Sequence, residues 1–190
     1  MSGEIPSFEE ALNLLKATGC SPKVIRHCRA VSDLAVRISR KCKENGVDVD
    51  LDLVRIGALL HDIGRSKTHS VHHPIIGSEI ARSLNLPEKI VRIIERHLGG
   101  GLTAKEAAEL GWPHRDYLPE TIEEKIVTYA DKLVDGERIV SIREAIEEFR
   151  RKLGANHPSI KRIMNLHKEI TRLCCGFQSE DSRKNSDFTH

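Results

Sequence analysis

Signals that start and stop helices recur along the whole 190-residue chain. A Ser or Thr three residues before a Glu, the spacing of a helix capping box, occurs at Ser7, Thr103 and Thr121. Ser21 followed by Pro22 is a pair typical of a helix N-cap and the first helical position. Sustained alternation of apolar and polar residues between Asn-Gly or Asp-Gly turns, which would indicate strands, does not occur. The sequence therefore predicts an all-α fold, a bundle of about eight or nine helices.

Length and composition fit one compact domain. The chain is long enough to bury a sizeable core, and 39% hydrophobic with 31% charged residues is ordinary globular usage. We expect a single helical domain over residues 1–175, with a motif-bearing core at about residues 20–140. Residues 176–190 are polar and unpatterned, so we expect them to form a flexible tail.

Charge and hydropathy argue against two kinds of partner. The formal net charge is +2 and only four Phe, two Tyr and one Trp are present, so nucleic acid is not a favoured ligand. No apolar run approaches the roughly 20 residues that span a bilayer, and the first residues lack the apolar core of a signal peptide. We therefore expect a cytoplasmic protein without a membrane partner, and a homo-oligomer is left open.

The five cysteines carry no motif of their own. None of them forms a CxxC pair, so neither a zinc knuckle nor a redox motif is indicated. In a reducing compartment we expect all five to be free thiols.

The strongest chemical signal is the doublet His61-Asp62, which follows an apolar run at the end of a helix predicted to be buried. Burying an unpaired carboxylate is unfavourable by several kcal/mol even after the surroundings relax. A divalent cation would remove that penalty. Because Gly64 relaxes the turn at the helix end, the imidazole and the carboxylate can converge on one ion.

Other His and Asp residues lie at predicted helix ends or on apolar faces. His27 lies one turn into the long helix that starts at Ser21, and His73 directly precedes a helix-starting proline. His97 ends the next helix, and Asp131 lies in the mostly apolar run IVTYADKLV. Together with the doublet they make a nitrogen and oxygen ligand set, which suits Mn, Fe, Co, Ni or Zn rather than Ca.

These residues stand in the order of a known signature. The sequence resembles the HD superfamily of metal-dependent phosphohydrolases, in particular its small HDIG-type members. The motifs that carry the resemblance are HDIG at 61–64, HPIIG at 73–77, RHLGGG at 96–101 and YADKL at 129–133. Two departures matter. Arg65 stands where many relatives have Lys, and the GYP signature of cyclic dinucleotide phosphodiesterases is absent after His97, so that specificity is not implied.

The resemblance implies one or two divalent transition-metal ions as cofactors. By analogy, one ion would bind His27, His61, Asp62 and Asp131, and a second would share Asp62 and add His73 and His97. Asp62 and Arg65 are the expected catalytic residues, Arg65 because it directly follows the HDIG motif that contains the metal-binding doublet. Substrate contacts are expected from Arg65, Lys67, Gly99, Gly100 and Lys132.

The expected activity is hydrolysis of a phosphoester by metal-activated water, with a nucleotide or another small phosphorylated metabolite as substrate. Two alternatives stay open. A few relatives of the same fold use a pair of irons to activate oxygen, and a non-catalytic module could bind a metal or a nucleotide for regulation. Each lone His or Gly also has a structural reading, as a core histidine or a helix C-cap.

Overall fold

The computed structural model describes residues 3–174, and the predicted all-α fold is confirmed in this part of the chain. Short 3-10 helices lie at Ile63–Ser66 (η1) and Leu98–Gly100 (η2). The nine α-helices of the described residues are α1 Phe8–Ala17, α2 Pro22–Glu44, α3 Leu51–Leu60, α4 His73–Ser83, α5 Glu88–Arg96, α6 Ala104–Glu109, α7 Ile122–Lys132, α8 Ile142–Leu153 and α9 Pro158–Leu173. The tail predicted for residues 176–190 lies outside the described residues.

Local capping explains where several helices begin. Ser7 Oγ accepts a hydrogen bond from the backbone N–H of Glu10, whose carboxylate accepts one from the N–H of Ser7 in return. Complete boxes of the same kind start α6 at Thr103 and α8 at Ser141. Thr121 also caps its helix, but the Glu three residues later turns its carboxylate elsewhere. Capping boxes thus set three helix starts, and those at Ser7 and Thr103 were predicted from the sequence.

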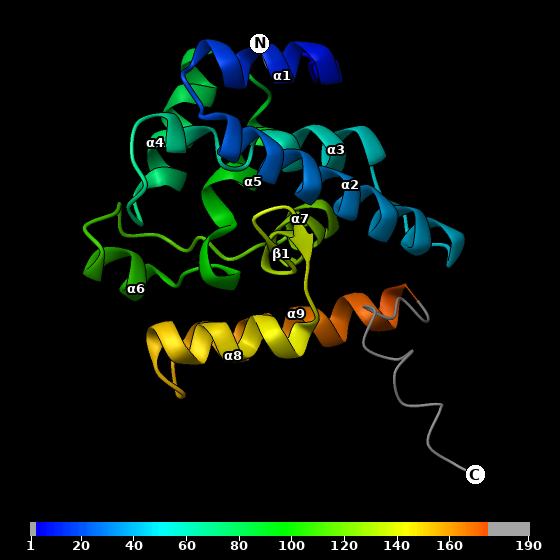
Figure 1. Ribbon diagram of the computed structural model, residues 1–190, viewed down its shortest axis with the longest axis vertical. Coiled ribbons are helices and arrows are strands. Elements are labelled where there is room, and N and C mark those ends of the chain that lie inside the picture. The colour runs from blue at the N-terminus through cyan, green and yellow to red at the C-terminus, as the bar shows by residue number, and fades with distance from the viewer. Residues whose placement is uncertain (1–2, 175–190) are drawn as a thin grey trace.

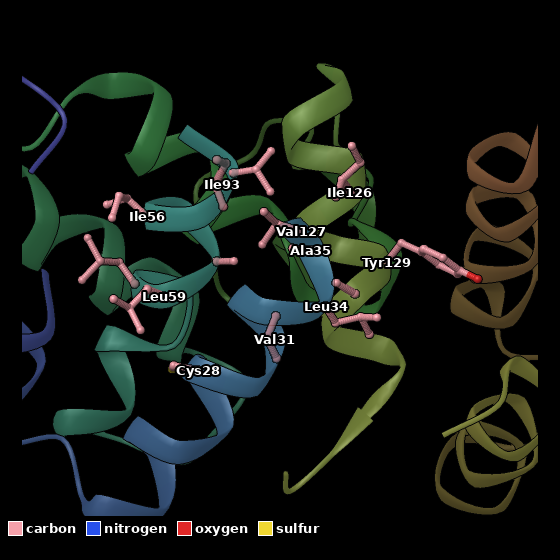
Figure 2. Close-up of a cluster of buried hydrophobic side chains, with 14 of the residues drawn as sticks. Cys28, Val31, Leu34, Ala35, Ile56, Leu59, Ile93, Ile126, Val127 and Tyr129 are labelled. Carbon is pink, nitrogen blue, oxygen red and sulfur yellow. The ribbon is translucent and has the colours of Figure 1, made fainter. Parts of the chain in front are cut away.

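The long helix α2 forms the centre of the core. It packs against α3 on one side and α7 on the other, while α5 packs against both α3 and α7. Figure 2 shows Val31 and Leu34 of α2 in one buried cluster with Leu59 of α3 and Val127 of α7. Figure 1 shows α8 and α9 together beneath α7, on the far side from α1. This arrangement brings the ends of α3, α5 and α7 to one place beside α2.

The prediction that the chain has no sheet is wrong at one point. Val134–Asp135 (β1) and Arg138–Ile139 (β2) form a short antiparallel hairpin around Gly136, which has a φ of +63°. Strands of two residues are too short to show alternation, so the sequence pattern could not reveal them. The hairpin follows α7 directly and therefore lies beside Asp131, near the end of that helix.

The prediction of free thiols is also wrong for one pair. Cys42 and Cys174 form a disulfide that joins the end of α2 to the end of α9, whereas Cys20 and Cys28 are buried free thiols. Cys175 lies outside the described residues. Among residues 3–174, none of the helices combines the length and apolarity required to cross a membrane.

Candidate metal centre

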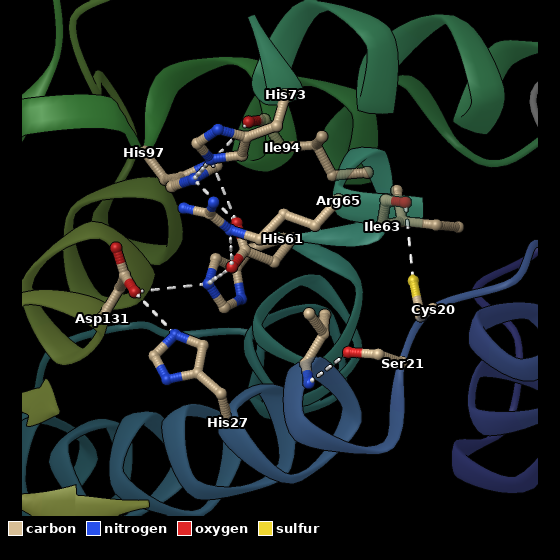
Figure 3. Close-up of polar contacts among 12 residues, drawn as sticks. Cys20, Ser21, His27, His61, Ile63, Arg65, His73, Ile94, His97 and Asp131 are labelled. Carbon is tan, nitrogen blue, oxygen red and sulfur yellow. Dashed lines mark hydrogen bonds and ion pairs between the residues drawn. The ribbon is translucent and has the colours of Figure 1, made fainter. Parts of the chain in front are cut away.

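Five segments bring the six predicted metal ligands together beside α2. His27 comes from α2, and the doublet His61-Asp62 from the end of α3. His73 begins α4, His97 directly follows α5, and Asp131 lies in the last turn of α7. Figure 3 shows the four imidazoles and the Asp131 carboxylate pointing toward one another.

The turn after α3 explains how the doublet reaches α4. Helix α3 is almost wholly buried, His61 has no exposed surface, and Asp62 begins the tight turn η1. A Cβ at Gly64 would lie 1.9 Å from the backbone oxygen of His73 and 2.6 Å from the backbone nitrogen of Gly77. The absence of a side chain at Gly64 therefore lets the start of α4 pack directly on this turn, which fixes His73 beside the doublet.

Each aspartate faces two imidazole nitrogens. Asp131 Oδ1 lies 3.1 Å from His27 Nε2 and 3.3 Å from His61 Nε2. Asp62 Oδ1 lies 3.1 Å from His73 Nε2 and 3.5 Å from His97 Nε2. His61 Nε2 is also 3.8 Å from Asp62 Oδ2. His61 therefore lies between the two aspartates and connects their clusters of imidazoles.

Hydrogen bonds on the outer side of the four imidazoles orient the rings. Every Nδ1 lies within hydrogen-bond distance of a backbone carbonyl, which assigns the proton to Nδ1 and leaves the Nε2 lone pair facing inward. The pairs are His27 with Gly136 (2.9 Å), His61 with Ala58 (2.7 Å), His73 with Ser70 (2.8 Å) and His97 with Ile94 (2.7 Å). The centre is thus lined by lone pairs.

With the protons on Nδ1, hydrogen-bond acceptors face one another inside the centre. His73 Nε2 and His97 Nε2 are 3.1 Å apart, and in the Nδ1–H tautomer neither has a proton to share. His61 Nε2 and Asp62 Oδ1 are buried without a hydrogen-bond partner. Neighbouring ligands about 2.1 Å from one transition-metal ion lie about 3 to 3.5 Å apart, close to the distances found here. The residues therefore fit a divalent cation.

Two overlapping sets of donor atoms could each hold an ion. One set is His27, His61 and Asp131, and the other is His61, Asp62 and His97. Within each set the donor atoms lie within 4.8 Å of one another. The sets resemble the two predicted sites in outline, with His61 shared between them, whereas Asp62 was the ligand predicted to be shared.

Burial and charge determine the protonation of the centre. Burial alone would raise the pKa of Asp62 and Asp131. In the metal-free centre, positive charge and N–H donation from facing imidazoles that take up a proton, together with Lys132 beside Asp131, hold the pKa of both carboxyls well below the usual range. Burial lowers the pKa of His97 to about 4. Both carboxylates are therefore charged and His97 is neutral near pH 7, which are the forms that bind a metal.

Two predicted substrate-binding cations contact the aspartates. Arg65 donates its Nε–H to Asp62 Oδ2 at 2.5 Å, and its side chain is partly exposed beside His27. Lys132 donates to Asp131 Oδ2, the oxygen that does not face the imidazoles. Lys67 is exposed on the segment after η1. Arg65 and Lys132 thus lie at the centre, while the role of Lys67 stays a prediction.

The predicted phosphate contacts at Gly99 and Gly100 have a competing structural explanation. Both residues are buried with positive φ, and a Cβ at Gly99 would lie 2.8 Å from Ser159 Oγ of α9. A Cβ at Gly100 would lie 3.3 Å from a side-chain carbon of Ile163. Close packing on α9 therefore accounts for both glycines, and their contact with substrate stays a prediction.

Sequence reasoning missed the carbonyl groups that orient the rings. Three of the four acceptors belong to the residue three positions before the histidine: Ala58, Ser70 and Ile94. The last carbonyls of a helix lack intrahelical partners, so His61 and His97, just after α3 and α5, can receive this support, whereas Ser70 lies in the loop before α4. For these two histidines, their position at a predicted helix end was the available signal. The fourth acceptor, Gly136, depends on the hairpin and had no signal.

Comparison with known proteins gives a family match. The model of the HD domain family matches residues 24–135. An uncharacterized protein of Methanocaldococcus jannaschii is 52% identical over 166 residues, which cover 87% of this chain and 98% of the relative. A ribonuclease Y of Acidothermus cellulolyticus is 30% identical, with 80% of this chain and 27% of that protein covered.

Another relative has a different name. A tRNA (cytidine(56)-2'-O)-methyltransferase of Picrophilus torridus is 42% identical over 170 residues. The match covers 90% of this chain, but the chain spans only 48% of the methyltransferase. The name describes a protein about twice as long as the matched region, so it does not assign an activity to that region.

A solved structure confirms the fold at low sequence identity. The HD domain of the Listeria monocytogenes phosphodiesterase PgpH, in complex with cyclic-di-AMP, superposes with a TM-score of 0.51 and 19% identity. The match covers 90% of this chain and 98% of that domain. The family match spans more than half of this chain and includes all six residues of the centre. The chain therefore belongs to the HD domain family.

Proposed function

We propose that this protein is a metal-dependent phosphohydrolase that cleaves a phosphoester of a nucleotide or another small phosphorylated metabolite. The observation that carries the proposal is the set of four imidazoles whose Nδ1 atoms face backbone carbonyls. Their Nε2 atoms surround the carboxylates of Asp62, which is buried, and Asp131, whose side chain is 11% exposed. A structural role would not require so many charged or polar groups in one buried place, because each unpaired one lowers stability.

The residues of the centre would hold one or two divalent ions. When bound, such ions lower the pKa of a bound water molecule and neutralise charge on a phosphate. The two carboxylates remove two of the four positive charges that two ions bring, so the centre stays cationic. A phosphate ester suits that charge, and Arg65 beside Asp62 offers a planar guanidinium on a side chain that is 29% exposed.

The comparisons support a nucleotide phosphoester as the substrate class. The PgpH domain binds cyclic-di-AMP, and ribonuclease Y is named for cleavage of RNA. Both ligands contain phosphodiesters between nucleotides. The GYP signature that would favour cyclic dinucleotides is absent from this sequence. We therefore propose only the substrate class, a nucleotide phosphoester.

The test is turnover by the metal-loaded full chain. Protein supplied with Mn²⁺, Co²⁺, Ni²⁺ or Mg²⁺ is incubated with nucleoside monophosphates, linear and cyclic dinucleotides, dinucleoside polyphosphates and bis(p-nitrophenyl) phosphate. We expect hydrolysis of at least one phosphoester, abolished in Asp62→Ala and retained in Asp33→Ala, which replaces an exposed aspartate of α2. A full panel without hydrolysis under any metal would contradict the proposal.

Metal analysis of the same protein adds a second readout. Asp62→Ala and His61→Ala should both lose bound transition metal as purified, since each removes a donor from the centre. Asp33→Ala should keep the metal content of the wild type. Full metal content in both centre variants would place the metal elsewhere.

A further inference from the structure

A large cavity in the described residues starts at the metal centre and extends well beyond it. It has a volume of about 1030 Å³, with His27 and Asp131 at one end, and continues past the β1–β2 hairpin along α8 as far as Lys152. Pockets for drug-sized ligands measure about 300 to 1,000 Å³. A simple phosphomonoester at the metal centre would therefore leave most of this cavity unfilled.

The walls of the cavity combine two kinds of surface. Val134, Val140 and the partly buried ring of Phe149 provide apolar patches. Lys132 and Arg143 provide cations along the same walls. A ligand with flat apolar groups and repeated negative charges matches this alternation, and a chain of nucleotides has both.

The acidic residues of α8 do not oppose such a ligand, because each is already paired. Glu144 accepts from Arg138 at 3.2 Å, and Glu147 accepts from Arg150 at 2.7 Å. Glu148 lies 2.7 Å from Arg151 and 2.8 Å from Lys152. These pairs neutralise the three glutamates that α8 contributes to the cavity wall.

Arg143 is the exception among the α8 cations. It is exposed in the first turn of α8 and lines the cavity, and within residues 3–174 its side chain makes no hydrogen bond or ion pair. Helix rise places its Cα about 13 Å from that of Lys152, so the cavity beside α8 is longer than one phosphate group. Its charge is free to meet an anion there.

We propose that this cavity binds a single-stranded oligonucleotide, with Arg143 contacting a backbone phosphate away from the metal centre. The inference rests on the proposed function for one point only, the placement of the scissile phosphate at the metals. The nucleotides on one side of that phosphate then lie along the hairpin and α8. The net charge of +2 for the whole chain does not indicate this site, because the unpaired positive charge of Arg143 is a local feature of the cavity wall.

Binding to the metal-free full chain tests the proposal without turnover. A fluorescein-labelled oligouridylate decamer is titrated with protein in EDTA at several salt concentrations, and binding is followed by fluorescence anisotropy. Arg143→Gln removes one charge, so the slope of log K against log salt should become shallower by about 0.7. Arg143→Glu should weaken binding about tenfold, the loss of one charge-assisted contact.

Arg37→Glu is the matched control, because Arg37 is an exposed arginine that lines a separate cavity with Phe8 and Arg55. It should change decamer affinity by less than about twofold. Circular dichroism checks that each variant is folded. Unchanged binding in both Arg143 variants, or equal weakening by Arg37→Glu, would overturn the proposal.

A length series provides an independent check on the wild type. The decamer should bind at least about tenfold more tightly than the dinucleotide pUpU, since only the decamer reaches α8. Equal affinities would exclude an extended site. Absence of hydrolysis in the substrate panel would count against the proposed function alone, because these binding measurements contain no metal and require no cleavage.

Discussion

Arg65 donates its Nε–H to Oδ2 of Asp62 at 2.5 Å, while Oδ1 of the same carboxylate faces the imidazoles of His73 and His97. The two oxygens of Asp62 therefore have different partners. An aspartate that bridges two ions through both of its oxygens gives one oxygen to each. In this structure Arg65 occupies Oδ2, the second oxygen of such a bridge, so in this binding mode the arginine and a second ion compete for Oδ2.

This competition predicts that loss of Arg65 strengthens binding of a second ion. In Arg65→Ala the free Oδ2 becomes available and a nearby positive charge is removed, so the second equivalent of Mn²⁺ should bind at least about tenfold more tightly. Isothermal titration calorimetry on metal-free protein measures both equivalents. Arg92→Ala, which removes an arginine about half exposed on α5, is the control. Equal affinities in Arg65→Ala and wild type would show that Arg65 does not regulate the second site.

Gly64 should be intolerant of any side chain. Its Cβ would meet backbone atoms of His73 and Gly77, which cannot rotate away, so Gly64→Ala should lower the free energy of unfolding by about 3 kcal/mol. The matched variant is Gly77→Ala, whose Cβ would first meet a side-chain carbon of Ile94 at 2.9 Å and should cost less. Urea unfolding of the metal-free protein measures both. A milder effect at Gly64 than at Gly77 would be inconsistent with the packing of α4 on η1.

Most helices could be predicted because their start signals are local. Ser7 and Thr103 need only a Glu three residues later to cap a helix, and both boxes form as expected. The hairpin at Gly136 and the bridge between Cys42 and Cys174 had no such signal. A two-residue strand has no period, and the two cysteines, 132 positions apart, meet only because α9 returns to the end of α2.

The residues of the candidate site could be proposed from the sequence, but the orientation of their side chains could not. The motif order supplied all six residues, including His27 and Asp131, which are far apart in the sequence. Which oxygen of Asp62 faces which ring depends on how α4 and α5 pack against α3, and no sequence pattern encodes that. The same holds for Gly99, whose tight approach to α9 is a tertiary contact.

The depressed pKa of His97 makes the metal-free protein sensitive to acid. His97 titrates near 6.5 when unfolded and at about 4 when folded, so the unfolded state binds the additional proton in between. The free energy of unfolding should therefore fall as pH decreases from about 6.5 to 4, by roughly 3 kcal/mol at most. Asp62 and Asp131 contribute in a lower window, because their lowered pKa values keep their stabilisation until pH falls below about 3.8.

Urea unfolding in EDTA at a series of pH values measures this dependence. His97→Gln should flatten the loss between pH 6.5 and 4, whereas His114→Gln, at an exposed position, should leave it unchanged. Saturating metal should also reduce the loss, since the ion and the proton compete for the same Nε2. A pH dependence identical in wild type and His97→Gln would assign the titration to another group.

The buried pair Arg96–Glu124 should stabilise the helix end that carries His97. Arg96 Nη1 donates to Glu124 Oε2 at 3.0 Å, and the two side chains are only 8% and 3% exposed. Arg96→Ala leaves the glutamate buried without its partner, so we expect a loss of about 3 to 5 kcal/mol in the free energy of unfolding. Arg96→Met combined with Glu124→Leu should recover most of that loss, because both charges are gone. If Arg96→Ala were as mild as Arg92→Ala, the pair would not stabilise the junction between α5 and α7.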